Sequence, residues 1–202
     1  MKKTLTLYIL LTTFFSSFAQ TDYVSISGKE KINIEAVTDK FNVQNYFEDE
    51  RLSKNNEYSA VRNYKIRIRK TEEKNIINYS LVLYSSSENF ATFGLLDFNY
   101  IEGFTNKENA FLGLVFKNLD KLDDKLFKDK IDYFQQKFGK PNYQFRDPLW
   151  NSVSKKLYSW KINNLIYVAY LDNQNHLRLH IINFDKLNYI ENTGLGWKLI
   201  DL

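Results

Sequence analysis

Residues 119–138, with the sequence LDKLDDKLFKDKIDYFQQKF, contain the most regular pattern of the chain. Their apolar positions recur at intervals of three and four residues, which lines one face of an α-helix. These positions are Leu119, Leu122, Leu126, Phe127, Ile131, Phe134 and Phe138. Asn118 or Asp120 is suited to cap the start of the helix. Gly139 is suited to the C-terminal cap, and Pro141 prevents continuation, so the stretch predicts one long amphipathic helix over about 119–138.

Upstream of this helix, two stretches alternate between apolar and polar residues, as half-buried strands do. Residues 64–70, with the sequence YKIRIRK, place three apolar side chains on one side and basic side chains on the other. Residues 76–84 alternate again after a polar turn, so the two stretches predict an antiparallel hairpin. Residues 90–104 and 110–116 are apolar and predict further strands.

Downstream of the helix, three stretches predict a meander of strands at residues 157–162, 165–171 and 176–184. Asn163 and Asn164 separate the first two and suit a tight type I′ turn, because Asn tolerates positive φ. A run of strands, one long helix and more strands is typical of an α+β protein. We therefore expect a mostly antiparallel β-sheet of hairpins and a meander, packed by the one helix.

The N-terminus has the three parts of a secretory signal peptide. Lys2 and Lys3 precede an uncharged, largely apolar run, which ends in the small-residue sequence SFA at 17–19. A retained membrane anchor is the alternative, but a spanning helix needs about 20 apolar residues and this run is shorter. We therefore predict a cleaved signal peptide at 1–19 and a single α+β domain at 20–202, exported to the periplasm or the cell exterior.

Nothing in residues 20–202 predicts a transmembrane segment, and no Cys follows the apolar run to carry a lipoprotein anchor. The net charge of +4 includes the two lysines of the signal segment, so the basic balance is no sign of nucleic acid binding. Lys is far more frequent than Arg and Asn is abundant, which indicates a bacterial source with an AT-rich genome. The aromatic share of 16% belongs mainly to the folded domain.

The composition excludes several kinds of chemistry. The chain has no Cys and two His, which removes disulfides, thiol nucleophiles, iron–sulfur clusters and cysteine zinc sites. His176 and His180 lie about 13 Å apart along a strand at about 3.3 Å per residue, so they cannot share a metal ion. No phosphate-binding loop, dinucleotide fingerprint, zinc-protease motif, calcium loop or serine-nucleophile elbow is present. We therefore predict no cofactor and no metal. The sequence leaves enzymatic activity open but favours a protein that is not an enzyme.

Three groups of residues form the candidate binding surface. The first is a basic strip, the second is an aromatic pair and the third is the polar side of the last predicted strand. Their members are Arg62, Lys65, Arg67 and Arg69; Trp150 and Tyr158; and His176, Arg178 and His180. The basic strip has a simpler interpretation as a solvated outer strand protected from edge pairing. Strand alternation likewise explains the third group as an exposed face.

These observations favour an exported, non-enzymatic binding protein. Its expected partner is an envelope protein, a glycan or an anionic lipid surface, because export argues against nucleic acid. One alternative is a hydrolase of envelope polymers with an unrecognised carboxylate pair. Another is a lipid or lipoprotein carrier, which would need an apolar cavity of several hundred Å3.

Overall fold

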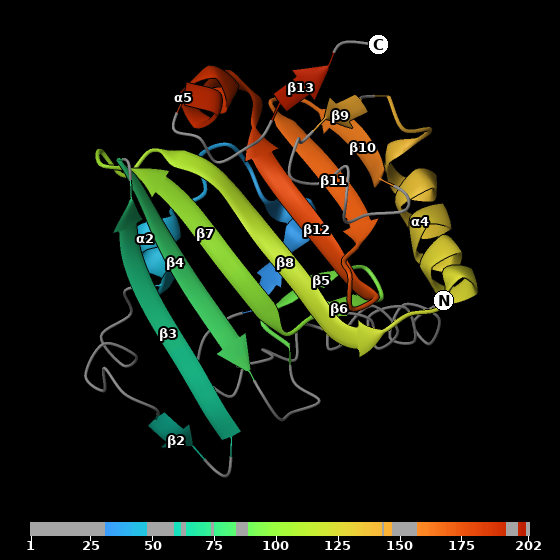
Figure 1. Ribbon diagram of the computed structural model, residues 1–202, viewed down its shortest axis with the longest axis horizontal. Helices are drawn as coiled ribbons and strands as arrows, with labels where there is room; N and C mark the ends of the chain where they lie inside the picture. The colour runs from blue at the N-terminus through green and yellow to red at the C-terminus, as the bar shows by residue number, and fades with distance from the viewer. Residues whose placement is uncertain are drawn as a thin grey trace, which may run out of the picture.

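An antiparallel sheet of eight strands forms the centre of the computed structural model (Figure 1). The structure describes residues 31–47, 59–61, 64–73, 75–83, 89–142, 144–146, 157–192 and 198–200. In spatial order the strands are β10 (Leu157–Ile162), β11 (Leu165–Leu171), β12 (His176–Asn183), β8 (Phe111–Lys121), β7 (Tyr100–Asn106), β4 (Ile76–Leu83), β3 (Tyr64–Glu73) and β2 (Ser59–Val61). The predicted α+β class, the hairpin of β3 with β4 and the meander of β10, β11 and β12 are confirmed.

The long helix, α4 (Asp124–Phe138), begins later than the sequence pattern predicts. Leu119 and Asp120 belong to strand β8, because β8 stays paired with β12 as far as Lys121 opposite His176. The predicted caps, Asn118 and Asp120, are therefore wrong. The cap is Asp123, whose side chain accepts a hydrogen bond from the Leu126 amide at 2.8 Å.

The C-terminal end of α4 matches the prediction. Gly139 has a φ of +80°, a conformation that glycine adopts without a steric penalty. The carbonyl of Gly139 also accepts a hydrogen bond from the Trp160 indole at 2.9 Å, which ties the helix end to β10.

Smaller elements flank the large sheet. In Figure 1, α2, β5 and β6 lie behind the sheet and α4 lies beside β10. The strands β1, β5 and β6 form a three-stranded sheet, and β9 pairs with β13. The bounds are β1 (Ile32–Asn33), η1 (Ile34–Ala36), α2 (Val43–Phe47), β5 (Ala91–Phe93), β6 (Leu96–Phe98), β9 (Gln144–Arg146), η2 (Phe184–Lys186), α5 (Leu187–Asn192) and β13 (Lys198–Ile200).

One face of the large sheet packs against α4 and the small sheet, and we call it the α4 face. It carries Trp160, Tyr167 and Leu179, which belong to the larger hydrophobic cluster. Phe134 of the helix is fully buried, with its ring centroid 5.6 Å from that of Trp160 and 4.6 Å from that of Phe93. Phe127, Ile131 and Phe134 of the predicted helix face are therefore buried, whereas Leu126 is 46% exposed. Many of the described aromatic side chains are packed inside.

The opposite face, which we call the α5 face, divides into an apolar and a polar half. Ile166, Val168 and Ile182 pack there against Leu187 and Ile190 in a smaller hydrophobic cluster. The other half carries the charged residues described below. Both faces of the central strands are thus largely buried.

The turn between β10 and β11 differs from the type I′ prediction. Asn163 has a φ of +54°, but Asn164 is not in the left-handed region, which a type I′ turn requires at both residues. The side chain of Asn164 instead donates hydrogen bonds to Asp39 at 3.1 Å and to Asp185 at 2.8 Å. These bonds connect the turn to the segment after η1 and to η2.

Candidate functional site

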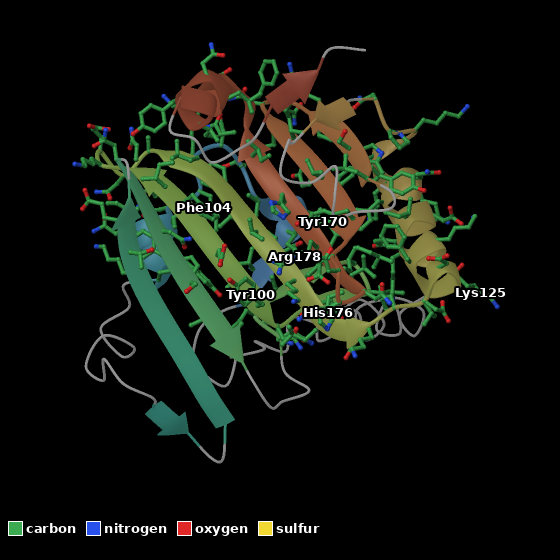
Figure 2. The ribbon with its side chains drawn as sticks, viewed as in Figure 1. Tyr100, Phe104, Lys125, Tyr170, His176 and Arg178 are labelled. Carbon is green, nitrogen blue, oxygen red and sulfur yellow. The ribbon has the colours of Figure 1, made fainter. Side chains whose placement is uncertain are left out.

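A network of charged and polar side chains lies on the α5 face where β7, β8 and β12 run side by side. The strand register places Tyr100, Lys117, Arg178 and Tyr170 in one row across four strands. Figure 2 shows Tyr100, Arg178, Tyr170 and His176 on the same face of the sheet. Strand pairing therefore gathers residues that are distant in sequence into one polar patch.

Asp172, in the turn between β11 and β12, is the centre of this network. Its Oδ1 accepts hydrogen bonds from the Gln174 amide at 2.9 Å and the His176 amide at 3.0 Å. Its Oδ2 lies 3.0 Å from Lys117 Nζ and 3.1 Å from Arg178 Nε. Burial alone would raise the pKa of Asp172, but these four donors outweigh it and lower the pKa to about 2. The carboxylate is therefore permanently charged near neutral pH.

Arg178 is the most accessible cation of the network. Its side chain is 27% exposed, whereas that of Lys117, the other cation, is 10% exposed. Nε is held by Asp172, and the guanidinium carbon lies 6.0 Å from the centre of the Tyr100 ring. Neither Nη atom makes a hydrogen bond to a residue that the structure describes. Within the described part of the chain, the guanidinium is thus held at one edge, and its two outer nitrogens carry donors without a partner.

Lys117 supplies a second positive charge from strand β8. The residue is 8% exposed, and its ammonium group contacts Asp172 and, at 3.4 Å, Gln174 Oε1. A buried ammonium group needs such a partner, because an isolated charge is strongly disfavoured away from water. Asp172 therefore contacts both neighbouring cations and can compensate the charge of only one of them.

Glu102, on β7, is the second carboxyl group of the patch. The Tyr100 hydroxyl donates a hydrogen bond to it. Burial raises the pKa of Glu102, and the positive charge of Arg178 opposes that increase without cancelling it. Two carboxyl groups near Arg178 thus have pKa values shifted in opposite directions, Glu102 upward and Asp172 downward.

Both histidines are buried, contrary to the exposed face that strand alternation predicts. His176 is 9% exposed and His180 is 5% exposed. His180 Nε2 lies 3.1 Å from the Tyr170 hydroxyl. Burial lowers the pKa of both rings, and the charge of Arg178 adds to this at both. At His176, Lys117 lowers the pKa further, and Asp172 opposes the decrease without cancelling it. The folded structure therefore keeps both imidazoles neutral near neutral pH.

The structure brings only part of the predicted binding surface together. His176, Arg178 and His180 lie in the network. Tyr158 is on the opposite, α4 face, where its ring packs 6.0 Å from that of Phe127. The basic residues Lys65, Arg67 and Arg69 lie in strand β3, and the register pairs Arg67 with Val82, which pairs with Tyr100. The side chains of this strip, together with Arg62 and Trp150, lie outside the described part.

Sequence reasoning did not identify Asp172, Lys117, Glu102, Tyr100 or Tyr170 as site residues. Asp172 begins the polar stretch DNQN, which is typical of a turn. Lys117 carried a usable signal, because it ends the apolar run FLGLVF and lysine is rarely buried unless it is paired. Its partner could not be found without the strand register.

The network is suited to binding and holds no group arranged for metal chemistry. Among the residues that the structure describes, no cluster of three or more His, Cys, Asp or Glu side chains could hold a metal ion. No described helix is long and apolar enough to cross a bilayer. No protein-family model, curated protein or solved structure matches the chain.

Proposed function

We propose that this chain is an exported, non-enzymatic binding protein whose ligand presents an anionic group to Arg178. The observation that carries the proposal is the guanidinium itself, which is held at Nε by Asp172, has no partner for either Nη atom among the described residues, and belongs to a side chain that is 27% exposed. The parallel donors of Arg match the two oxygens of a carboxylate or phosphate group. Export is supported by the signal-peptide pattern of residues 1–19.

Preorganisation favours this site over the other exposed cations. A flexible Lys or Arg loses side-chain entropy when it binds, whereas Asp172 and Tyr100 already hold Arg178 in place. Asp172 compensates the charge of Lys117, and the raised pKa of Glu102 favours its neutral form beside Arg178, so the guanidinium is the group toward which an anion would be drawn. The ligand that fits is an acidic group of an envelope protein, a glycan or a lipid headgroup.

The test measures binding to three defined anionic probes: an acidic peptide, a carboxylated oligosaccharide and vesicles that contain anionic lipid. Arg178→Gln is expected to weaken the preferred probe about 10- to 100-fold, the equivalent of losing hydrogen bonds to a charged group. Lys128→Gln is the matched control. It removes one positive charge from an exposed helix residue that pairs with Asp132.

Two results would contradict the proposal. Equal weakening in Arg178→Gln and Lys128→Gln would mean that only the overall charge attracts the probe. Unchanged binding in Arg178→Gln would remove the site altogether. Capture of envelope components by the mature protein, with and without Arg178→Gln, then identifies the partner in a mixture.

A hydrolase remains the second candidate because Glu102 and Asp172 have oppositely shifted pKa values, as acid and base pairs do. The hydrogen bonds of Asp172 weigh against it, since four donors already occupy this carboxylate. Hydrolysis of glycoside or ester reporters that Glu102→Gln abolishes would establish this candidate and overturn the non-enzymatic proposal.

The carrier alternative has no support on the α5 face. The apolar cavity there, beside Phe104 and Ile190, has a volume of about 50 Å3. A lipid-sized ligand requires several hundred Å3. The cavity of the α5 face is therefore too small for a lipid.

A further inference from the structure

A second cavity lies on the α4 face at the far end of the β10–β11 hairpin. Its volume is about 480 Å3, which is within the range of small-molecule sites. The walls come from the segment that follows η1, the end of α4 and the turn between β10 and β11. Because Tyr167 lines it from the α4 face, the cavity is separate from the Arg178 network on the opposite face.

Tyr167 is the unusual side chain of this cavity. The residue as a whole is 4% exposed, but its hydroxyl oxygen is accessible to water and makes no hydrogen bond to a residue that the structure describes. Its ring packs 4.7 Å from that of Phe138, and burial raises the pKa of the phenol to about 12. A hydroxyl that reaches a cavity can donate a hydrogen bond to water or to a ligand group there.

Asp39 and Asn164 add polar groups to the lining of the cavity. Asn164 Nδ2 donates to Asp39 Oδ2 at 3.1 Å and to Asp185 Oδ2 at 2.8 Å, which fixes the orientation of this amide. Oδ1 of Asp39 accepts no hydrogen bond within the described structure, and Asp39 and Asn164 both line the cavity. An amide and a carboxylate held side by side suit the adjacent hydroxyl groups of one ligand.

The charges of the lining argue against an anionic ligand. Glu35 and Lys137 form an ion pair of 3.0 Å and compensate each other. Asp39 then leaves the cavity with one negative charge in excess. The apolar side chains Phe138, Ile162 and Leu165 complete the wall. A ligand with one apolar surface and several hydroxyl groups fits this mixture of walls.

From the cavity volume, the Tyr167 hydroxyl and the Asp39–Asn164 pair, we propose that this cavity binds one neutral sugar ring. The C–H face of the ring packs against Phe138 and the other apolar walls. Ring hydroxyls donate to Asp39 and Asn164, and another accepts a hydrogen bond from Tyr167. The site is independent of the anion site at Arg178, so neither proposal depends on the other.

The experiment titrates the mature protein with free glucose, galactose, mannose and N-acetylglucosamine, and with glucosamine and glucuronate as charged comparisons. Ligand-observed NMR and calorimetry detect saturable binding, expected with a Kd of about 1 mM for at least one neutral sugar. Asp39→Asn should weaken that sugar about tenfold, because a charged acceptor becomes a neutral one. Tyr167→Phe should weaken it about three- to tenfold by removing one hydroxyl.

Asp129→Asn is the matched control, since Asp129 is an exposed carboxylate of α4 that does not line the cavity. The affinity of this control variant for the sugar should stay within about twofold of that of the unaltered protein, which is a small difference in binding free energy. Arg178→Gln should likewise retain full sugar binding. A thermal unfolding curve for each variant separates lost binding from lost folding, and Tyr167→Phe keeps the buried ring in place.

Each of the following results would overturn the proposal: no saturable binding of any neutral sugar, binding that both cavity variants leave unchanged, or binding confined to glucosamine or to glucuronate. Sugar binding that Arg178→Gln abolishes would place the ligand on the other face and would also overturn it. Failure of the anion-binding test leaves these outcomes unaffected.

Discussion

Replacing Asp172 with Asn tests whether this carboxylate holds the polar network together. The Asn oxygen can still accept from the amides of Gln174 and His176. The new NH2 group then lies next to Lys117 and Arg178, and all three groups are hydrogen-bond donors. The two partly buried cations also lose the negative charge that compensated them. We expect Asp172→Asn to destabilise the fold more than an ordinary surface substitution does.

The magnitude follows from two contributions. The pKa of Asp172 falls from 3.8 to about 2 on folding. This shift corresponds to about 2 kcal/mol by linkage, or about 1–2 kcal/mol after solvent screening. Leaving donors unsatisfied adds about 1–3 kcal/mol. The expected loss at neutral pH is therefore about 3 kcal/mol, at the lower end of the range for a broken buried ion pair.

Urea unfolding followed by far-ultraviolet circular dichroism measures this loss. Because the folded pKa of Asp172 is lowered, its stabilisation is present above pH 3.8 and disappears as the pH falls through about 2. The difference between the two proteins should shrink over the same interval. Adding Lys117→Met to Asp172→Asn should recover about 1–2 kcal/mol, since it removes an uncompensated charge. A loss under about 1 kcal/mol, or strict additivity of the two substitutions, would refute the reasoning.

Three further predictions concern the fold. Phe134→Ala should cost about 3–5 kcal/mol in urea unfolding, because the ring is fully buried beside Trp160; a cost near zero would contradict the assigned core. Gly113→Ala should cost about 1–3 kcal/mol and lower the thermal midpoint, because its Cβ would lie 2.7 Å from the Ile181 carbonyl oxygen in the paired strand; an unchanged midpoint would contradict that approach. Asp123→Ala should cost about 1 kcal/mol through loss of the helix cap, and Asp123→Ser should recover most of it.

The fold class could be predicted because its signals are local. The three- and four-residue spacing of α4, the alternation of β3 and the polar turns of the meander each depend on neighbouring residues. The start of α4 could not be predicted from spacing, because Leu119 and Leu122 fit a helical pattern equally well. Pairing of β8 with β12 as far as Lys121 decides the boundary, and that contact joins distant parts of the chain.

The candidate site was only partly predictable for the same reason. Alternation along β12 places His176, Arg178 and His180 on one face, as predicted. Their burial depends on neighbours such as Lys117 and Tyr170, which the register supplies. Alternation with a period of two shows which residues share one side of a strand, but it does not show whether other residues cover that side. A buried polar face and an exposed polar face therefore have the same sequence pattern.

The two histidines are the side chains whose ordinary pKa lies nearest neutral pH, yet the fold prevents them from responding there. Burial lowers the pKa of both, so the folded state requires the neutral rings. For a base with a lowered folded pKa, the stabilisation is present above pH 6.5 and is lost as the pH falls through the folded value. Acidification below pH 6.5 therefore lowers the free energy of unfolding through these two rings. The anion binding proposed for this face therefore depends on the permanent charges of Arg178 and Lys117, which Asp172 holds in place, and not on the histidines.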